Sequence, residues 1–104
     1  MKAVVVLNNF WEWSGGFEQF LMWEGIDKPD SFDFYTHKAA NDHFKKFISD
    51  VLSRKNSING ISYSSDDTIM SWQLANEPRS RPEECQAYSN WITDIAKYIR
   101  SRAT

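Results

Sequence analysis

The stretch TIMSWQLANEPR, residues 68–79, alternates along an apolar run and then ends abruptly in Asn76, Glu77, Pro78 and Arg79. This alternation predicts a β-strand over residues 68–75. Larger side chains occupy one face, and small or polar ones occupy the other: Met70, Trp72 and Leu74 against Ser71, Gln73 and Ala75. We expect the larger set to pack beneath helices. If the strand stays regular to its end, Glu77 lies on the same face as Ser71, Gln73 and Ala75. Glu77 is then either a solvated loop residue or part of an active site.

Two further segments upstream have clear periodicity. AVVVL, residues 3–7, is β-branched and continuously apolar, which is typical of a parallel strand covered on both faces. Residues 38–54 show the helical period, with one apolar face made of Phe44, Phe47, Ile48, Val51 and Leu52. Between them lies a long irregular segment, residues 10–36, with a short helical turn expected over residues 17–23.

The C-terminal segment predicts another helix. Ser80 and Glu83 have the spacing of a capping box, and Pro82 suits a first helical turn. An apolar stripe follows: Tyr88, Trp91, Ile92, Ile95, Ala96 and Ile99. The order strand, loop, helix, strand, helix predicts an α/β fold of two parallel βα units. In such folds ligands bind where the strands end, so Asn8-Asn9 and Asn76-Glu77 should meet at one edge of the sheet.

The length, net charge and composition of the chain argue against several classes of function. With 104 residues the chain is one domain at most, and its net charge of −2 gives no reason to expect nucleic acid or an anionic membrane as a partner. No apolar run is long enough to span a bilayer, and no signal peptide is visible. Cys85 is the single cysteine, which we interpret as a packed or half-exposed thiol, and His37 and His43 as surface residues. No metal-binding or phosphate-binding motif is apparent, so no cofactor is expected.

The loop after the first strand is rich in aromatic residues. FWEWSGGFEQFLMW, residues 10–23, contains six aromatics: Phe10, Trp11, Trp13, Phe17, Phe20 and Trp23. Such rings either form a small local core or stack on a ligand, and sugar rings suit aromatic faces. Packing is the expected role of Phe17 and Phe20. Trp11 and Trp13, next to the strand end, are the better candidates for ligand contact.

Two motifs resemble one enzyme family. WQLANEPR and LNNFWEWSGG, about sixty residues apart with a helix between them, closely resemble glycoside hydrolase family 5, in particular its endo-β-1,4-mannanases. The resemblance covers nearly the whole chain and implies a fragment of a (β/α)8 TIM barrel, from about the third to the fourth βα unit. Residues 1–104 would then be part of a catalytic domain, because a complete barrel takes about 250 residues.

The resemblance also implies roles for individual residues. Glu77 matches the catalytic acid/base of a retaining glycosidase, and Asn76 matches the asparagine that hydrogen-bonds the sugar 2-hydroxyl. Arg79 matches an arginine near the leaving-group side of the cleft, and Trp11 lies in a loop that supplies aromatic contacts. We therefore expect a substrate-binding set around Glu77: Asn76, Arg79, Trp11, Trp13 and Asn9.

The family's nucleophile glutamate is expected on a later strand and has no counterpart here. Other carboxylates do not match its position: Glu12, Glu18, Glu24, Asp66 and Asp67. We therefore expect the isolated chain to be inactive and to be a partial gene product of a β-mannan-cleaving enzyme. The polymeric substrate implies a secreted or periplasmic parent. Three alternatives stay open: a β-glucanase of the same family, a non-catalytic carbohydrate-binding fragment and a non-functional pseudogene product.

Overall fold

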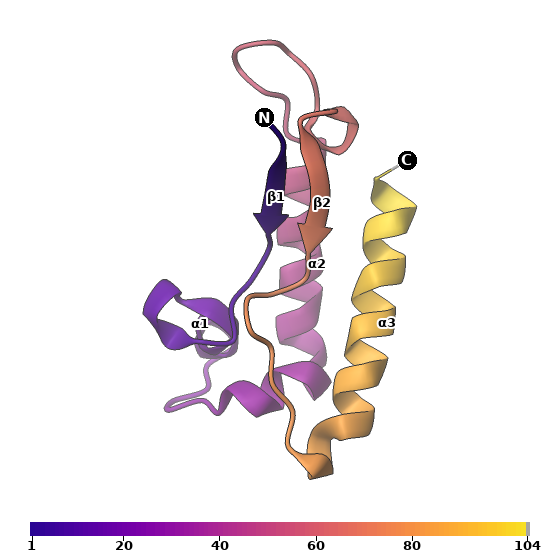
Figure 1. Ribbon diagram of the computed structural model, residues 1–104. Helices are drawn as coiled ribbons and strands as arrows, with labels where there is room; N and C mark the ends of the chain where they lie inside the picture. Colours follow the sequence, from indigo (N-terminus) through magenta and orange to yellow (C-terminus); the bar gives the residue numbers. More distant parts are fainter. Residues whose placement is uncertain (104) are drawn as a thin grey trace.

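The computed structural model describes residues 1–103 and contains two parallel strands flanked by helices (Figure 1). Strand β1 spans Ala3–Val6 and pairs in parallel with β2, Ile69–Gln73. Helix α2, Lys38–Ser53, connects them behind the sheet, and α3, Cys85–Arg102, runs beside it. The short helix α1, Gly16–Trp23, lies at the end toward which both strands run. The predicted α/β order of two parallel βα units is confirmed.

One face of the sheet is covered less than the sequence indicates. Val4 and Val6 are 42% and 46% exposed, whereas Leu7, just beyond β1, belongs to the core. Among the described residues, the helices pack on one side of the two strands. The expectation that residues 3–7 form a strand covered on both faces is therefore wrong for this chain.

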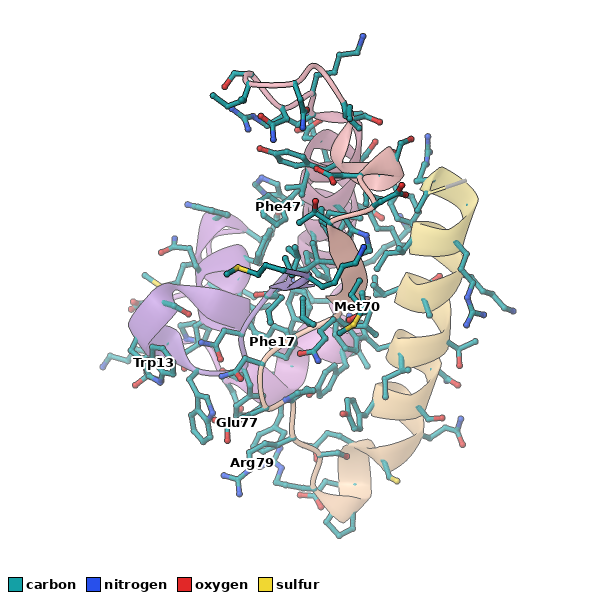
Figure 2. All side chains as sticks on the ribbon, turned by 45° about the horizontal axis from the view of Figure 1, so that its top comes forward. Trp13, Phe17, Phe47, Met70, Glu77 and Arg79 are labelled. Atoms are coloured by element: carbon teal, nitrogen blue, oxygen red, sulfur yellow. The ribbon has the colours of Figure 1, made fainter. Side chains whose placement is uncertain are left out.

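The alternation predicted for residues 68–75 is interrupted at Met70. The register places Ala3 opposite Ile69 but Val4 opposite Ser71, so Met70 is an extra residue at a bulge. Its side chain is 66% exposed instead of packed (Figure 2). Trp72 and Leu74 do pack against the core. A bulge shifts the faces of all residues on one side of it, so strand parity alone misplaces Met70.

The core is aromatic and lies between the helices. Phe17 stacks on Phe34 with ring centroids 4.4 Å apart and meets Trp91 edge-on at 5.6 Å. Burying rings of this size supplies most of the stabilisation of such a core. The indole of Trp91 donates to Asn41 Oδ1 at 2.7 Å, and Asn41 Nδ2 donates to the Phe34 carbonyl at 2.7 Å. This buried polar pair ties α3 and α2 to residues 31–36.

The N-terminal capping of α2 and α3 differs in part from the capping that the sequence predicts. The side chain of His37 caps α2, because its Nδ1 accepts from the Ala40 N–H at 3.1 Å. The capping box of Ser80 and Glu83 is wrong: a 3-10 turn, Pro82–Glu84, precedes α3, and Ser80 Oγ donates to the Arg81 carbonyl. The Arg81 guanidinium instead donates to Glu84 and lowers the pKa of that carboxyl. Within residues 1–103, no helix is long and apolar enough to cross a membrane.

Candidate functional site

The polar residues that follow the two strands meet as predicted. Asn9 and Asn76 form a parallel bridge beyond the last residues of β1 and β2. The Asn76 N–H donates to the Asn8 carbonyl at 2.9 Å, and the Phe10 N–H donates to the Asn76 carbonyl at 3.2 Å. The backbone ladder therefore continues past both strands and brings Glu77 next to the aromatic loop.

Asn9 connects the parts of this edge. It is only 7% exposed, and its Oδ1 accepts from the Trp11 N–H at 3.1 Å and from Asn76 Nδ2 at 3.3 Å. Its Nδ2 donates to Ser14 Oγ at 2.6 Å. Both ends of this amide are thus used within the protein, which leaves little of Asn9 to contact a substrate. Its geometry supports a structural role in aligning Trp11 with Asn76.

Glu77 occupies a strained backbone position. Its φ is +46°, in the left-handed region that costs a residue with a side chain about 1–2 kcal/mol. Because β2 ends at Gln73, the side-chain direction of Glu77 is set by this turn and not by strand parity. The carboxylate is exposed, and its Oε1 accepts from Trp11 Nε1 at 3.2 Å. Strained non-glycine residues cluster at functional sites.

The strain at Glu77 predicts a gain in stability from Glu77→Gly. Glycine adopts positive φ without steric cost, so the substitution should raise the free energy of unfolding by about 0.5–1 kcal/mol. Glu12 lies in a 3-10 turn, Glu12–Ser14, where glycine relieves no strain. Chemical denaturation of the chain should therefore show Glu12→Gly to be neutral or destabilising, and equal effects of the two variants would contradict the prediction.

Arg79 and Trp11 lie against each other beside Glu77. The Arg79 guanidinium carbon is 5.4 Å from the centroid of the Trp11 ring, within the range of a cation–π contact. Arg79 belongs to none of the salt bridges within residues 1–103. Figure 2 shows Glu77 and Arg79 on the segment that leaves β2.

Tyr35, a buried core residue, anchors the segment that carries Glu77 and Arg79. The sequence patterns did not identify Tyr35 as part of the site. Its hydroxyl donates to the Arg79 carbonyl at 2.7 Å. Burial, and secondarily the neighbouring Tyr88, raises the pKa of Tyr35 well above its ordinary value of 10.0. The hydroxyl therefore stays protonated and keeps donating. The only sequence signal for this role is the cluster of aromatic residues within residues 31–36.

The raised pKa of Tyr35 predicts a loss of stability in alkali. The unfolded chain releases this proton near pH 10 and the folded chain releases it only at higher pH, so Tyr35 contributes no pH dependence below about 10 and destabilises the fold above it. Denaturant unfolding between pH 8 and 11 should show a steeper decline in the wild type than in Tyr35→Phe. Tyr35→Phe should also cost about 1 kcal/mol at pH 7 through the lost hydrogen bond. Tyr98→Phe, which leaves that bond intact, is the control; an unchanged alkaline slope in Tyr35→Phe would contradict the assignment.

The aromatic loop combines both predicted roles. Phe10, Phe17 and Phe20 are buried in the core, whereas Trp13 is 72% exposed and Trp11 is half-buried. Trp13 borders a cavity of about 830 Å³ between β1, α1 and α2. Its wall also includes Asn8, Asn9, Asn76, Trp23, His43 and Phe47. Glu77 does not line this cavity, although the preceding residue, Asn76, does.

The remaining side chains with possible chemical roles form no metal-binding cluster in the part of the chain that the structure describes. Within residues 1–103, no three His, Cys, Asp or Glu side chains are placed to hold a metal ion. Cys85 is exposed at the start of α3, so the expectation of a packed or half-exposed thiol is wrong. His43, on α2, is exposed as expected, and its ring contacts Phe20 and Trp23 of α1. The groups that surround the Glu77 carboxylate at this edge are the amides of Asn9 and Asn76, the Ser14 hydroxyl, the Arg79 guanidinium and aromatic rings.

Solved structures share this arrangement. The endo-β-1,4-mannanase of Thermotoga petrophila superposes with a TM-score of 0.90 at 31% identity, over 97% of this chain and 22% of that protein. The endo-1,4-β-mannanase of Rhizomucor miehei superposes with a TM-score of 0.88 at 37% identity, over 97% of this chain and 30% of that protein. Both are (β/α)8 barrels, so the two βα units correspond to part of such a barrel.

Sequence comparisons agree with the structural ones. Mannan endo-1,4-beta-mannosidase 1 of Arabidopsis thaliana is 37% identical over 102 residues, which are 97% of this chain and 24% of that protein. The chain thus spans about a quarter of the length of this relative. The family model described as GH family 5 beta-mannosidase-like matches residues 1–104. The chain belongs to glycoside hydrolase family 5, among its β-mannosidase-like members.

Proposed function

We propose that the chain forms the acid/base side of a retaining endo-β-1,4-mannanase. The observation that supports this most directly is the bridge between Asn9 and Asn76, which holds Glu77 at the carboxyl end of β2 beside Trp11. That end is where (β/α)8 barrels carry their active sites. The mannanase relatives supply the substrate class, β-1,4-linked mannan.

In the proposed mechanism Glu77 acts twice. Its protonated carboxyl gives a proton to the glycosidic oxygen while a second carboxylate attacks the anomeric carbon, and it then takes a proton from the water that hydrolyses the glycosyl intermediate. Retaining enzymes place the two carboxyl groups about 5–5.5 Å apart. The second carboxylate is proposed to come from outside residues 1–104, so the isolated chain should not hydrolyse mannan.

The neighbours of Glu77 are proposed to bind the sugar chain. Asn76 is assigned to the 2-hydroxyl of the sugar under attack, and Arg79 to the leaving-group side. Trp13, with its exposed indole, supplies a stacking surface, and Trp11 contacts both Arg79 and Glu77. Asn9 supports the set through Asn76 and Trp11. Because mannan is too large to enter cells, we expect the complete enzyme to act outside the cell or in the periplasm.

A chimaera tests the proposal. The part of the Rhizomucor miehei mannanase that matches this chain is replaced by residues 1–104, which keeps the remaining barrel strands of that enzyme. The chimaera is expected to hydrolyse β-mannan with retention of anomeric configuration, seen by NMR of the first products, whereas the isolated chain gives no reducing sugar. A folded chimaera without activity on β-mannan would count against the proposal.

The same assay separates the alternatives. Faster cleavage of β-1,4-glucan than of β-mannan by the chimaera would favour a glucanase. If instead the isolated chain binds mannooligosaccharides saturably, and this binding requires Trp13 but not Glu77, the carbohydrate-binding reading gains support. The 72% exposed indole of Trp13 is the observation that makes this second reading worth testing.

A further inference from the structure

The indole N–H of Trp11 is directed at the Glu77 carboxylate. The contact joins Trp11 Nε1 and Glu77 Oε1 at 3.2 Å and connects residues 66 positions apart in the sequence. Within residues 1–103, no other hydrogen bond involves the Glu77 side chain. A glutamate at an exposed position otherwise moves freely about three side-chain bonds, so this contact selects one orientation of the carboxylate.

The Trp11 ring is itself held on several sides. Its backbone N–H donates to Asn9 Oδ1 at 3.1 Å, and the edge of the ring meets Phe10 with centroids 5.1 Å apart and planes at 83°. The Arg79 guanidinium covers part of the ring at 5.4 Å. Asn9 also binds Asn76, the residue before Glu77. The hydrogen bonds of Asn9 to Trp11 and to Asn76 therefore position both the indole donor and the Glu77 acceptor. This shared support favours a fixed geometry over a chance surface contact.

We propose that Trp11 is a positioning residue that acts on the reaction through Glu77, an inference that rests on the function proposed above. With Oε1 accepting from the indole, the carboxyl proton is carried by Oε2. An indole N–H is a donor only and does not titrate in water, so it fits the carbonyl oxygen of the protonated acid and also the carboxylate formed after proton transfer. Trp11 thus keeps Glu77 in one orientation through both of its roles.

An NMR titration of the full chain tests the contact without requiring turnover. In 15N-labelled protein, the indole signal that disappears in Trp11→Phe is assigned to Trp11. Between pH 7 and pH 3 this signal is expected to follow a carboxyl titration. The movement should be lost in Glu77→Gln, which keeps an acceptor but does not titrate, and should persist in Glu12→Gln. A Trp11 signal that moves equally in Glu77→Gln would overturn the proposal.

Turnover by the chimaera separates this inference from the function on which it rests. Trp11→Phe keeps an aromatic ring but removes the donor, and misorientation of a catalytic group lowers the rate while uniform binding is kept, so we expect kcat to fall about tenfold with KM within about twofold. Unchanged kcat in Trp11→Phe, together with an inactive Glu77→Gln, would defeat the positioning role alone. Full activity of Glu77→Gln would defeat the proposed function itself.

Discussion

Glu77→Gln is expected to lower β-mannan hydrolysis by the chimaera by roughly 10²–10⁴-fold, the range that a general acid/base supplies. Glutamine matches the shape of glutamate and still offers an oxygen to Trp11 Nε1, so the backbone turn and the contact at 3.2 Å should persist. What is lost is the proton that the leaving oxygen requires. Initial rates on β-mannan, with circular dichroism to confirm folding, measure this effect.

Glu12→Gln is the matched control for that experiment. Glu12 is an exposed glutamate on the same aromatic loop, and the sequence left it, with Glu18 and Glu24, as a poorly matching alternative carboxylate. Its substitution should change the rate less than about twofold, because a solvated surface carboxylate takes no part in proton transfer. If Glu12→Gln abolishes activity and Glu77→Gln does not, the acid/base assignment is wrong.

Gly16→Ala is expected to destabilise the chain by about 3 kcal/mol or more. Gly16 has a φ of +60°, and a Cβ there would lie 2.6 Å from the Trp11 carbonyl oxygen and closer still to that of Asn9. The clash is with backbone, which cannot rotate away. The next residue, Phe17, donates its N–H to the Asn9 carbonyl at 2.8 Å. The clash would therefore push α1 away from Asn9, the residue that binds Asn76.

Gly60→Ala isolates the part of this effect that comes from the clash. Gly60 has a similar φ of +72°, but a Cβ there meets nothing within 4 Å. It should therefore show only the cost of a left-handed alanine, about 1–2 kcal/mol. Urea unfolding of both variants gives the difference directly. Equal losses of unfolding free energy in the two variants would mean that Gly16 tolerates a Cβ and that the close approach to Asn9 does not matter.

Local patterns were sufficient for the main elements. The helix expected over residues 38–54 is Lys38–Ser53, and the helical turn expected over residues 17–23 is Gly16–Trp23. Helical periodicity is a property of neighbouring residues, so it can be detected without knowledge of the fold. Packing roles were predictable in part for the same reason, because Phe17, Phe44 and Ile48 repeat on apolar faces and are fully buried. Phe47 and Ile92, expected on the apolar faces of their helices, are instead 42% and 38% exposed.

Two local patterns failed, one because of a pairing between distant residues and one because of a competing contact between near neighbours. The bulge at Met70 arises from pairing with β1, and the capping box at Ser80 and Glu83 is displaced by the contact of Arg81 with Glu84. Each motif was compatible with its own short segment. At Met70 the tertiary pairing with β1 set the backbone, and at Arg81 a neighbouring carboxylate was the partner; a single short motif includes neither competition.

The candidate site likewise combines features that the local sequence determines with features that only tertiary contacts determine. The stop after residues 68–75, and with it the placing of Asn76 and Glu77 at the end of a parallel strand, follows from hydrophobic alternation within a few residues. The family membership follows from two short motifs. The tertiary structure alone decides how Glu77 is held: a left-handed backbone, an indole N–H from Trp11, and the Tyr35 hydroxyl on the Arg79 carbonyl. These contacts join residues 44 and 66 positions apart, and such pairings arise only when the chain closes long loops around its core.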